Sequence, residues 1–238
     1  MKSPRRVLVV QTAFLGDVVL TLPLVQVIHR TYPETEISFL ATPRGAEALH
    51  NHPAIHSVVV YDKRGAQRGI RPLLRLVRWL KSQEFDVALV PHRSFRSALL
   101  VWLTGIPVRI GFDTSAGAFM FTRTVPYVRS AHEVSRNFAF LTPLEIGAPP
   151  RELPELYPSS SDVKAVDEFL KEFKVGDRGK IIALSPGSAW NTKRWPSGRF
   201  AELAKRLRHR VRHDDATTSP VGVTKTPLHS PIARWNPR

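Results

Sequence analysis

The chain has 238 residues, and 35 lysines and arginines against 20 acidic side chains leave a formal net charge of +15. This length suits one large domain or two small ones, and 42% apolar residues are enough for a packed core. The lack of cysteine excludes disulfides and thiolate metal sites, and the positive charge favours an anionic partner, either nucleic acid, an acidic membrane surface or a phosphorylated substrate.

The amino terminus combines basic residues with an apolar run at 7–10, a pattern that resembles a signal peptide. Gln11 and Asp17 interrupt the apolar segment, and no small-residue cleavage site follows. We interpret the run as a buried first strand. The longest other apolar stretch, 98–103, is far too short to span a bilayer, so we expect a soluble protein or one bound only at a membrane surface.

Predicted strands and helices alternate through the first half of the chain. Apolar runs predict strands at 7–10, 37–41, 58–61, 87–90 and 109–112, and amphipathic segments predict helices at 18–32, 43–51, 69–83 and 94–104. Thr42 before Pro43 marks a helix start, and Ser94 and Gly105 bound the last helix. This alternation predicts an α/β fold with a parallel sheet that helices cover on both faces.

A second α/β unit is predicted to follow a proline-rich linker. A helix at 132–144 completes a first domain over residues 1–148, and four prolines mark a linker over 149–160. A helix at 161–173, a strand at 181–184 and a helix at 198–210 then begin a second domain over 161–211. One strand with its helices cannot bury both faces of a sheet, so we expect this half to be unstable alone.

The periodic pattern ends near Val211. Residues 212–238 show neither strand nor helix periodicity and are predicted to be irregular. A disordered tail explains this. A change of reading frame or a broken gene explains it too, and we favour that interpretation because the apolar pattern stops directly after a normal strand and helix.

The turn after the first strand, residues 11–21, carries a carboxylate at the first helical turn. Asp17 would lie at the carboxyl edge of a parallel sheet, where open α/β folds bind ligands. It is a candidate general base. From the spacing alone, the favoured interpretation is a helix cap that complements the helix dipole.

The segment 181–196 has the features of a diphosphate-binding loop. A predicted strand ends in Ser185-Pro186-Gly187-Ser188, where small residues allow close backbone approach to an anion. Hydroxyl donors and positive charge follow at Ser188, Thr192, Lys193 and Arg194. The P-loop pattern is absent, and an ordinary basic surface loop remains the alternative.

Together these stretches resemble the lipopolysaccharide heptosyltransferases, and among them the heptosyltransferase II branch. The likeness covers about residues 6–211. It is carried by the order and spacing of several short motifs, namely Thr12, Gly16-Asp17-Val18, Thr21-Leu22-Pro23, Ala41-Thr42-Pro43-Arg44-Gly45, Tyr61-Asp62-Lys63-Arg64-Gly65, Pro91-His92-Arg93-Ser94, Gly111-Phe112, His132-Glu133-Val134-Ser135-Arg136-Asn137, Pro186-Gly187-Ser188 and Lys193-Arg194-Trp195-Pro196.

The resemblance implies a glycosyltransferase-B fold of two Rossmann-like domains, the second incomplete here. It implies an inverting enzyme that transfers heptose from ADP-L-glycero-D-manno-heptose to the lipopolysaccharide inner core without a metal or other cofactor. The implied partners are this donor, an anionic Kdo-lipid A acceptor and the cytoplasmic face of the inner membrane, to which the protein would be peripheral.

The resemblance also assigns roles to residues. Asp17 would take the proton from the acceptor hydroxyl. Ser188, Thr192 and Lys193 would bind the donor phosphates, with Thr12 on the same rim. Lys63, Arg64, His132 and Arg136 would meet the anionic acceptor, although a solvated basic face is the alternative for these four.

The likeness stops short of the rest of the family's second domain, including its acidic ribose contacts and an Asp-Thr-Gly stretch. We therefore expect this chain to be weakly active or inactive by itself. One alternative is a noncatalytic product of a disrupted gene. A basic nucleic-acid-binding protein is disfavoured because no binding motif appears, and a dinucleotide oxidoreductase is disfavoured because the first turn lacks G-x-G-x-x-G.

Overall fold

A computed structural model describes residues 3–63, 65, 67–173, 182–188 and 191–214. The chain divides into two compact units, the first running to Pro158 and the second beginning at Ser159. No helix in the described part of the chain is long and apolar enough to cross a membrane.

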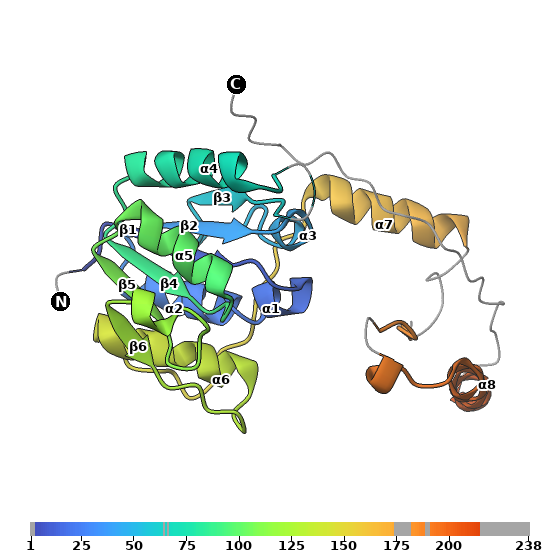
Figure 1. Cartoon of the computed structure of the whole chain (residues 1–238). Helices are drawn as coiled ribbons and strands as arrows, with labels where there is room; N and C mark the ends of the chain where they lie inside the picture. Colours follow the sequence, from blue (N-terminus) through green and yellow to red (C-terminus); the bar gives the residue numbers. More distant parts are fainter. Residues whose placement is uncertain (1–2, 64, 66, 174–181, 189–190, 215–238) are drawn as a thin grey trace. The chain divides into compact units, whose positions relative to one another are not determined.

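The first unit is built on a six-stranded parallel sheet (Figure 1). Its strands lie in the order β3-β2-β1-β4-β5-β6. The chain therefore adds β2 and β3 on one side of β1 and β4 to β6 on the other, and the boundary between β1 and β4 is the reversal point of the sheet. In this register Val9 of β1 lies between Phe39 of β2 and Leu89 of β4. The strands are β1 (Arg6–Gln11), β2 (Glu36–Ala41), β3 (Ser57–Val60), β4 (Val87–Val90), β5 (Val108–Phe112) and β6 (Arg123–Val125).

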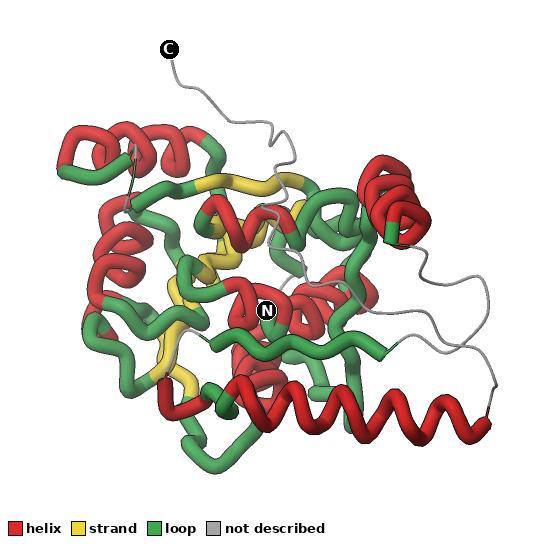
Figure 2. Tube along the Cα trace, turned by 90° about the vertical axis from the view of Figure 1, so that its right-hand side faces the viewer, coloured by secondary structure: helices red, strands yellow, loops and turns green. Residues whose placement is uncertain are grey.

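Helices cover both faces of the sheet, and the strands run between them (Figure 2). Val7 and Val9 of β1 face a core closed by α2 (Leu22–Thr31) and the 3₁₀ segment η2 (Phe138–Leu144). Leu8 and Val10 face the opposite core, closed by α4 (Ile70–Ser82) and α5 (Phe95–Thr104). A strand buried on both faces explains why β1 is a continuous apolar run.

Short helices complete the first unit. α1 (Leu15–Val19) and α3 (Pro43–Glu47) follow β1 and β2, the 3₁₀ turn η1 (Ala118–Met120) precedes β6, and α6 (Glu133–Asn137) precedes η2. Thr42 and Ser94 cap α3 and α5 through their side chains, as predicted.

The five predicted strands of this unit are confirmed, each to within one residue at either end. β6 was not predicted. It has only three residues, Arg123–Val125, and its arginine and threonine are exposed at the edge of the sheet. A strand this short and polar leaves no apolar run in the sequence.

Two predicted helices are each divided in the structure. The helix predicted at 18–32 is wrong as one element, because α1 ends before Thr21 and α2 begins at Leu22. Pro23 lacks an N–H and fits only the first turn of a helix, so a new helix starts there. The helix predicted at 132–144 becomes α6 followed by η2, which contains Pro143.

The proline-rich segment at 149–158 packs along α2. Gln26 donates to the Leu153 carbonyl at 3.0 Å and accepts from the Glu155 N–H at 3.0 Å. Arg30 pairs with Glu152 at 3.0 Å, and this guanidinium is the largest cause of the lowered pKa of the Glu152 carboxyl. The contacts hold this part of the predicted linker against the first unit.

The described part of the second unit contains α7 (Ser160–Glu172), the 3₁₀ turn η3 (Asn191–Lys193) and α8 (Ser197–Asp214). None of its described side chains is buried. The strand predicted at 181–184 is wrong for residues 182–184, which adopt no regular structure, and Ile181 lies outside the described residues. No other strand lies in the described part of this unit to supply backbone hydrogen bonds, and a single strand is not stable alone. The irregular tail was predicted to begin too early, because α8 continues through residues 212–214, and residues 215–238 lie outside the described residues.

Candidate functional site

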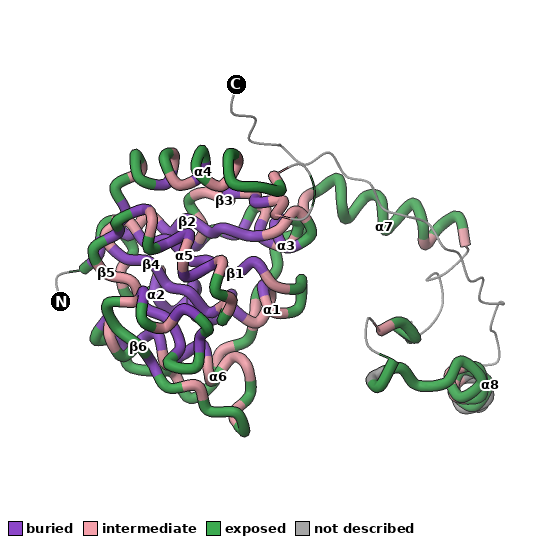
Figure 3. The backbone as a smooth tube through the Cα atoms, viewed as in Figure 1, coloured by how far each residue is buried: buried purple, intermediate pink, exposed green. Residues whose placement is uncertain are grey.

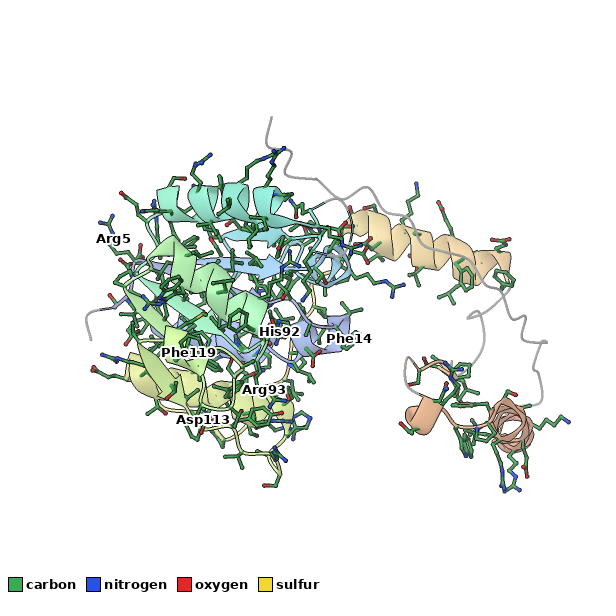
Figure 4. All side chains as sticks on the ribbon, in the orientation of Figure 1. Arg5, Phe14, His92, Arg93, Asp113 and Phe119 are labelled. Carbon is green, nitrogen blue, oxygen red and sulfur yellow. The ribbon has the colours of Figure 1, made fainter. Side chains whose placement is uncertain are left out.

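The predicted acidic turn lies at the reversal point of the sheet. β1 and β4 are neighbours, and the segments that leave their carboxyl ends, 12–17 and 91–94, meet there. Figure 4 shows Phe14, His92 and Arg93 toward this edge of the sheet. Open α/β folds bind ligands in the crevice at this position.

Asp17 occupies the third position of α1 and is partly exposed. Its Oδ2 accepts the Phe14 N–H at 3.0 Å, so the carboxylate does cap the helix. Among the described residues, Oδ1 has no hydrogen-bond partner. The cap therefore fixes the orientation of the side chain and leaves one oxygen for another proton donor.

Thr12, the first residue after β1, lies at the centre of a polar network. Its Oγ1 is 3.0 Å from His92 Nδ1 and 3.4 Å from Ser97 Oγ. Lys63 Nζ donates to the Thr12 carbonyl at 2.7 Å and to its Oγ1 at 3.1 Å. Three segments, following β1, β3 and β4, are thus tied together beneath the acidic turn.

Burial, with the Lys63 ammonium and the Arg93 guanidinium nearby, lowers the pKa of His92 to about 4. The imidazole is therefore neutral at neutral pH, and Nδ1 is shared between the hydroxyls of Thr12 and Ser97, the latter at 2.9 Å. His92 was not among the predicted site residues. Its signals in the sequence were its place in the Pro91-His92-Arg93-Ser94 motif and its position two residues beyond a buried strand.

Acid is expected to destabilise the first unit through His92. Because its folded-state pKa lies below the ordinary value, the stabilisation is complete above about pH 6.5 and is lost as pH falls toward 4. We expect a loss on the order of 2 kcal/mol, reduced by the partial exposure of the ring. His92→Asn should make urea-unfolding stability fall less steeply between pH 6.5 and 4, whereas exposed His56→Asn should leave the slope unchanged. The remaining slope includes His52, because burial lowers the pKa of that imidazole too. Equal slopes in all three proteins would contradict this assignment.

Arg136, predicted to meet an anionic acceptor, is held on α6 by neighbours. It pairs with Glu133 at 2.8 Å and donates to the Tyr127 hydroxyl. Its guanidinium lies 4.7 Å from the Tyr127 ring centre, and that of Arg93 lies 3.9 Å from it. The two cations and the aromatic ring form a positively charged group beyond β4 that the sequence did not reveal.

The structure brings only some of the predicted acceptor residues together. Lys63 joins Thr12, and Arg64 lies outside the described residues. His132 Nδ1 accepts the Val134 N–H at 3.3 Å and caps α6, so its contact in this structure is structural. α6 lies against the start of α2, since Asn137 Nδ2 donates to the Leu20 carbonyl at 3.0 Å.

The predicted phosphate loop belongs to the second unit. Arg194 Nη2 donates to the Ser188 carbonyl at 2.7 Å, which closes the loop on itself. Thr192 and the backbone of Lys193 form η3, with Thr192 exposed. The side chain of Lys193 lies outside the described residues. The described loop therefore presents small residues and an exposed hydroxyl at the start of α8.

Comparison with known proteins gives one consistent result. The family model described as Glycosyltransferase family 9 (heptosyltransferase) matches residues 73–211, more than half of the chain. The lipopolysaccharide core heptosyltransferase OpsX of Haemophilus influenzae is 28% identical over 208 residues, which are 85% of this chain and 57% of that protein.

Solved structures agree on the fold. A glycosyl transferase family 9 protein from Veillonella parvula matches with a TM-score of 0.79 and 22% identity, over 87% of this chain and 60% of that one. The E. coli heptosyltransferase WaaC, solved with ADP-2-deoxy-2-fluoro heptose, matches with a TM-score of 0.64 and 21% identity, over 85% and 65%. The chain thus spans less than two thirds of the length of these relatives.

Proposed function

The chain belongs to glycosyltransferase family 9, and on that premise we propose that it acts in transferring L-glycero-D-manno-heptose from ADP-heptose to the lipopolysaccharide inner core. The family match over residues 73–211 carries this proposal. The similarity to OpsX, a lipopolysaccharide core heptosyltransferase, supports the acceptor class. The presence of an ADP-linked heptose analogue in the WaaC structure supports the donor class.

The proposed reaction is a direct displacement with inversion. The acceptor hydroxyl oxygen attacks the anomeric carbon of the heptose, and the bond from that carbon to the ADP oxygen breaks. Asp17 takes the hydroxyl proton as general base. The partly exposed carboxylate at the reversal point of the sheet supports this role, because its cap bond to Phe14 orients it and leaves Oδ1 for the acceptor.

ADP departs with negative charge on its β-phosphate. We propose that Ser188, Thr192 and Lys193 hold this diphosphate, and that Thr12 also takes part in donor binding. Fixed donors and a cation stabilise developing charge most strongly where water is excluded. In this proposal, cationic side chains neutralise the charge on the leaving diphosphate, as a metal ion does in other transferases.

The acceptor is proposed to meet the cationic edge of the first unit through Lys63, Arg64, His132 and Arg136. Lys63 and the Arg93–Tyr127–Arg136 group lie on segments beyond β3, β4 and β6, which supports an anionic acceptor. His132 and Arg136 hold structural contacts as well, so their contribution to acceptor binding is the smaller part of the proposal. We also propose that the protein works at the cytoplasmic face of the inner membrane, where such an acceptor is anchored.

Lys193→Gln is expected to weaken ADP binding by about tenfold or more, since a charge-assisted hydrogen bond contributes roughly 1.5–3 kcal/mol. Isothermal titration of the full chain with ADP measures the change. Lys205→Gln, which removes an exposed cation from α8, is the control and should leave affinity unchanged. Equal affinity in all three proteins would remove Lys193 from the donor site.

The function itself is tested with purified chain, ADP-heptose and a Kdo-lipid A acceptor. We expect only weak transfer by this chain alone, detected by mass spectrometry as a small amount of heptosylated lipid with an equal amount of released ADP. Robust turnover would contradict the expected impairment, and release of ADP without any heptosylated lipid would overturn the proposed transfer. Tight, steeply salt-dependent binding to duplex DNA without transfer would instead support the nucleic-acid alternative.

A further inference from the structure

The outer side of α4 carries a row of exposed cations. Arg71, Arg75 and Arg78 are spaced by four and three residues, which places them on one helical face. All three are exposed, whereas Leu76 and Leu80 on the inner side are buried against the sheet. α4 itself contains no acidic residue. The row is therefore not neutralised by partners on its own helix.

The neighbouring helix α5 is apolar on its outer side as well as its inner side. Leu100 and Val101 are buried, yet Phe95 is 47% exposed and Trp102 is 51% exposed. Arg96 is the one charged residue within this helix. A surface helix of a soluble protein normally carries a polar outer face, so half-exposed aromatic side chains at a spacing of seven residues call for a partner.

These two helices form one surface. α4 and α5 pack against each other and close the same core on the same face of the sheet. α4 is exposed along much of its outer side, as Figure 3 shows in green, and α5 is exposed at Phe95 and Trp102. We call this surface the α4–α5 face and define it by Arg71, Arg75, Arg78, Phe95 and Trp102.

We propose that the α4–α5 face docks onto the surface of an anionic phospholipid bilayer. Arginines beside exposed aromatic side chains are the combination that binds at a membrane interface, because the cations meet phosphate headgroups while the rings enter the acyl boundary. The arginine stems are apolar and let the guanidinium groups reach the headgroup level. The inference rests on the proposed function only in that the lipid-anchored acceptor gives docking a purpose.

The test is vesicle co-sedimentation of the full chain, without donor or acceptor. Vesicles of phosphatidylcholine alone are compared with vesicles that also contain phosphatidylglycerol. We expect binding only to the anionic vesicles, weakened by salt. The Arg71→Gln, Arg75→Gln, Arg78→Gln variant should lower the partition coefficient on the order of 100-fold, because each cation near an anionic surface contributes about 1 kcal/mol. Trp102→Gln should lower it by about tenfold through lost apolar burial.

A matched variant separates this face from net charge. Lys164→Gln, Lys171→Gln, Lys205→Gln removes three exposed cations from α7 and α8 and should change binding less than about threefold. Circular dichroism and thermal melting confirm that every variant is folded. The proposal would be overturned if the two triple variants lost vesicle binding equally, or if the unchanged chain did not bind anionic vesicles. It would also be overturned if the triple arginine variant lost binding to duplex DNA but kept its binding to vesicles. The vesicle assay does not measure heptose transfer. Its result therefore stands whether or not the transfer assay supports the proposed function.

Discussion

Replacing Asp17 by asparagine is expected to lower kcat for heptose transfer by roughly 10²–10⁴-fold, the range for losing a general base. Asparagine keeps the shape of the side chain, and its carbonyl oxygen can still accept the Phe14 N–H that Asp17 Oδ2 accepts at 3.0 Å. The helix cap is therefore retained while the proton acceptor is lost. KM should change little, because the substitution removes an interaction made in the transition state.

The measurement compares initial rates of ADP release with acceptor present, in a version of the chain completed with a full second domain, and uses Glu34→Gln as the control. Glu34 is an exposed carboxylate before β2, at the opposite edge of the sheet from the acidic turn, so its loss should leave kcat unchanged. Unchanged turnover in Asp17→Asn would limit Asp17 to its capping role. A large loss in stability together with turnover would point to the same conclusion, so urea unfolding accompanies the assay.

The largest effect on stability is expected at Phe140. Phe140→Ala should lower the free energy of unfolding by about 3–5 kcal/mol, the usual range for emptying the space of a buried phenylalanine. The ring is fully buried and lies edge-to-face with Phe112 of β5, with 4.8 Å between ring centres. The substitution thus removes both the burial and an aromatic contact between η2 and the sheet.

Urea unfolding monitored by circular dichroism tests this expectation. Phe140→Leu keeps most of the volume and should cost less than about 1.5 kcal/mol. Phe119→Ala, at a ring that is 78% exposed, should stay within about 0.5 kcal/mol of the unchanged chain. If Phe140→Ala and Phe119→Ala shifted the transition equally, η2 would not be part of the core described above.

Local sequence determined the sheet of the first unit well because its strands are buried on both faces. A continuous apolar run such as 7–10 contains no polar residue, so the sequence distinguishes it clearly from a loop. Two helix predictions failed where proline intervened, at Pro23 and Pro143, and the helix predicted at 43–51 ends early, at Glu47. The strand predicted at 181–184 failed for another reason, since an apolar run becomes a strand only when neighbouring strands pair with it.

The site shows the same division between local and distant information. The acidic turn was predictable because strand, turn and capping signals follow one another within residues 7–21. The Thr12–His92 contact joins residues 80 positions apart, and Arg93 and Arg136 meet only through Tyr127. No spacing in the chain encodes such contacts, because strand order decides which loops become neighbours.

That strand order also affects how the protein is made. β1 is synthesised first but lies between β2 and β4, and Val7 pairs with Val87, which emerges from the ribosome 80 residues later. At typical rates of synthesis this delay is about 4–16 s. During it one edge of the apolar strand β1 has no backbone partner, so the nascent chain carries an unpaired strand edge that favours aggregation until β4 is synthesised.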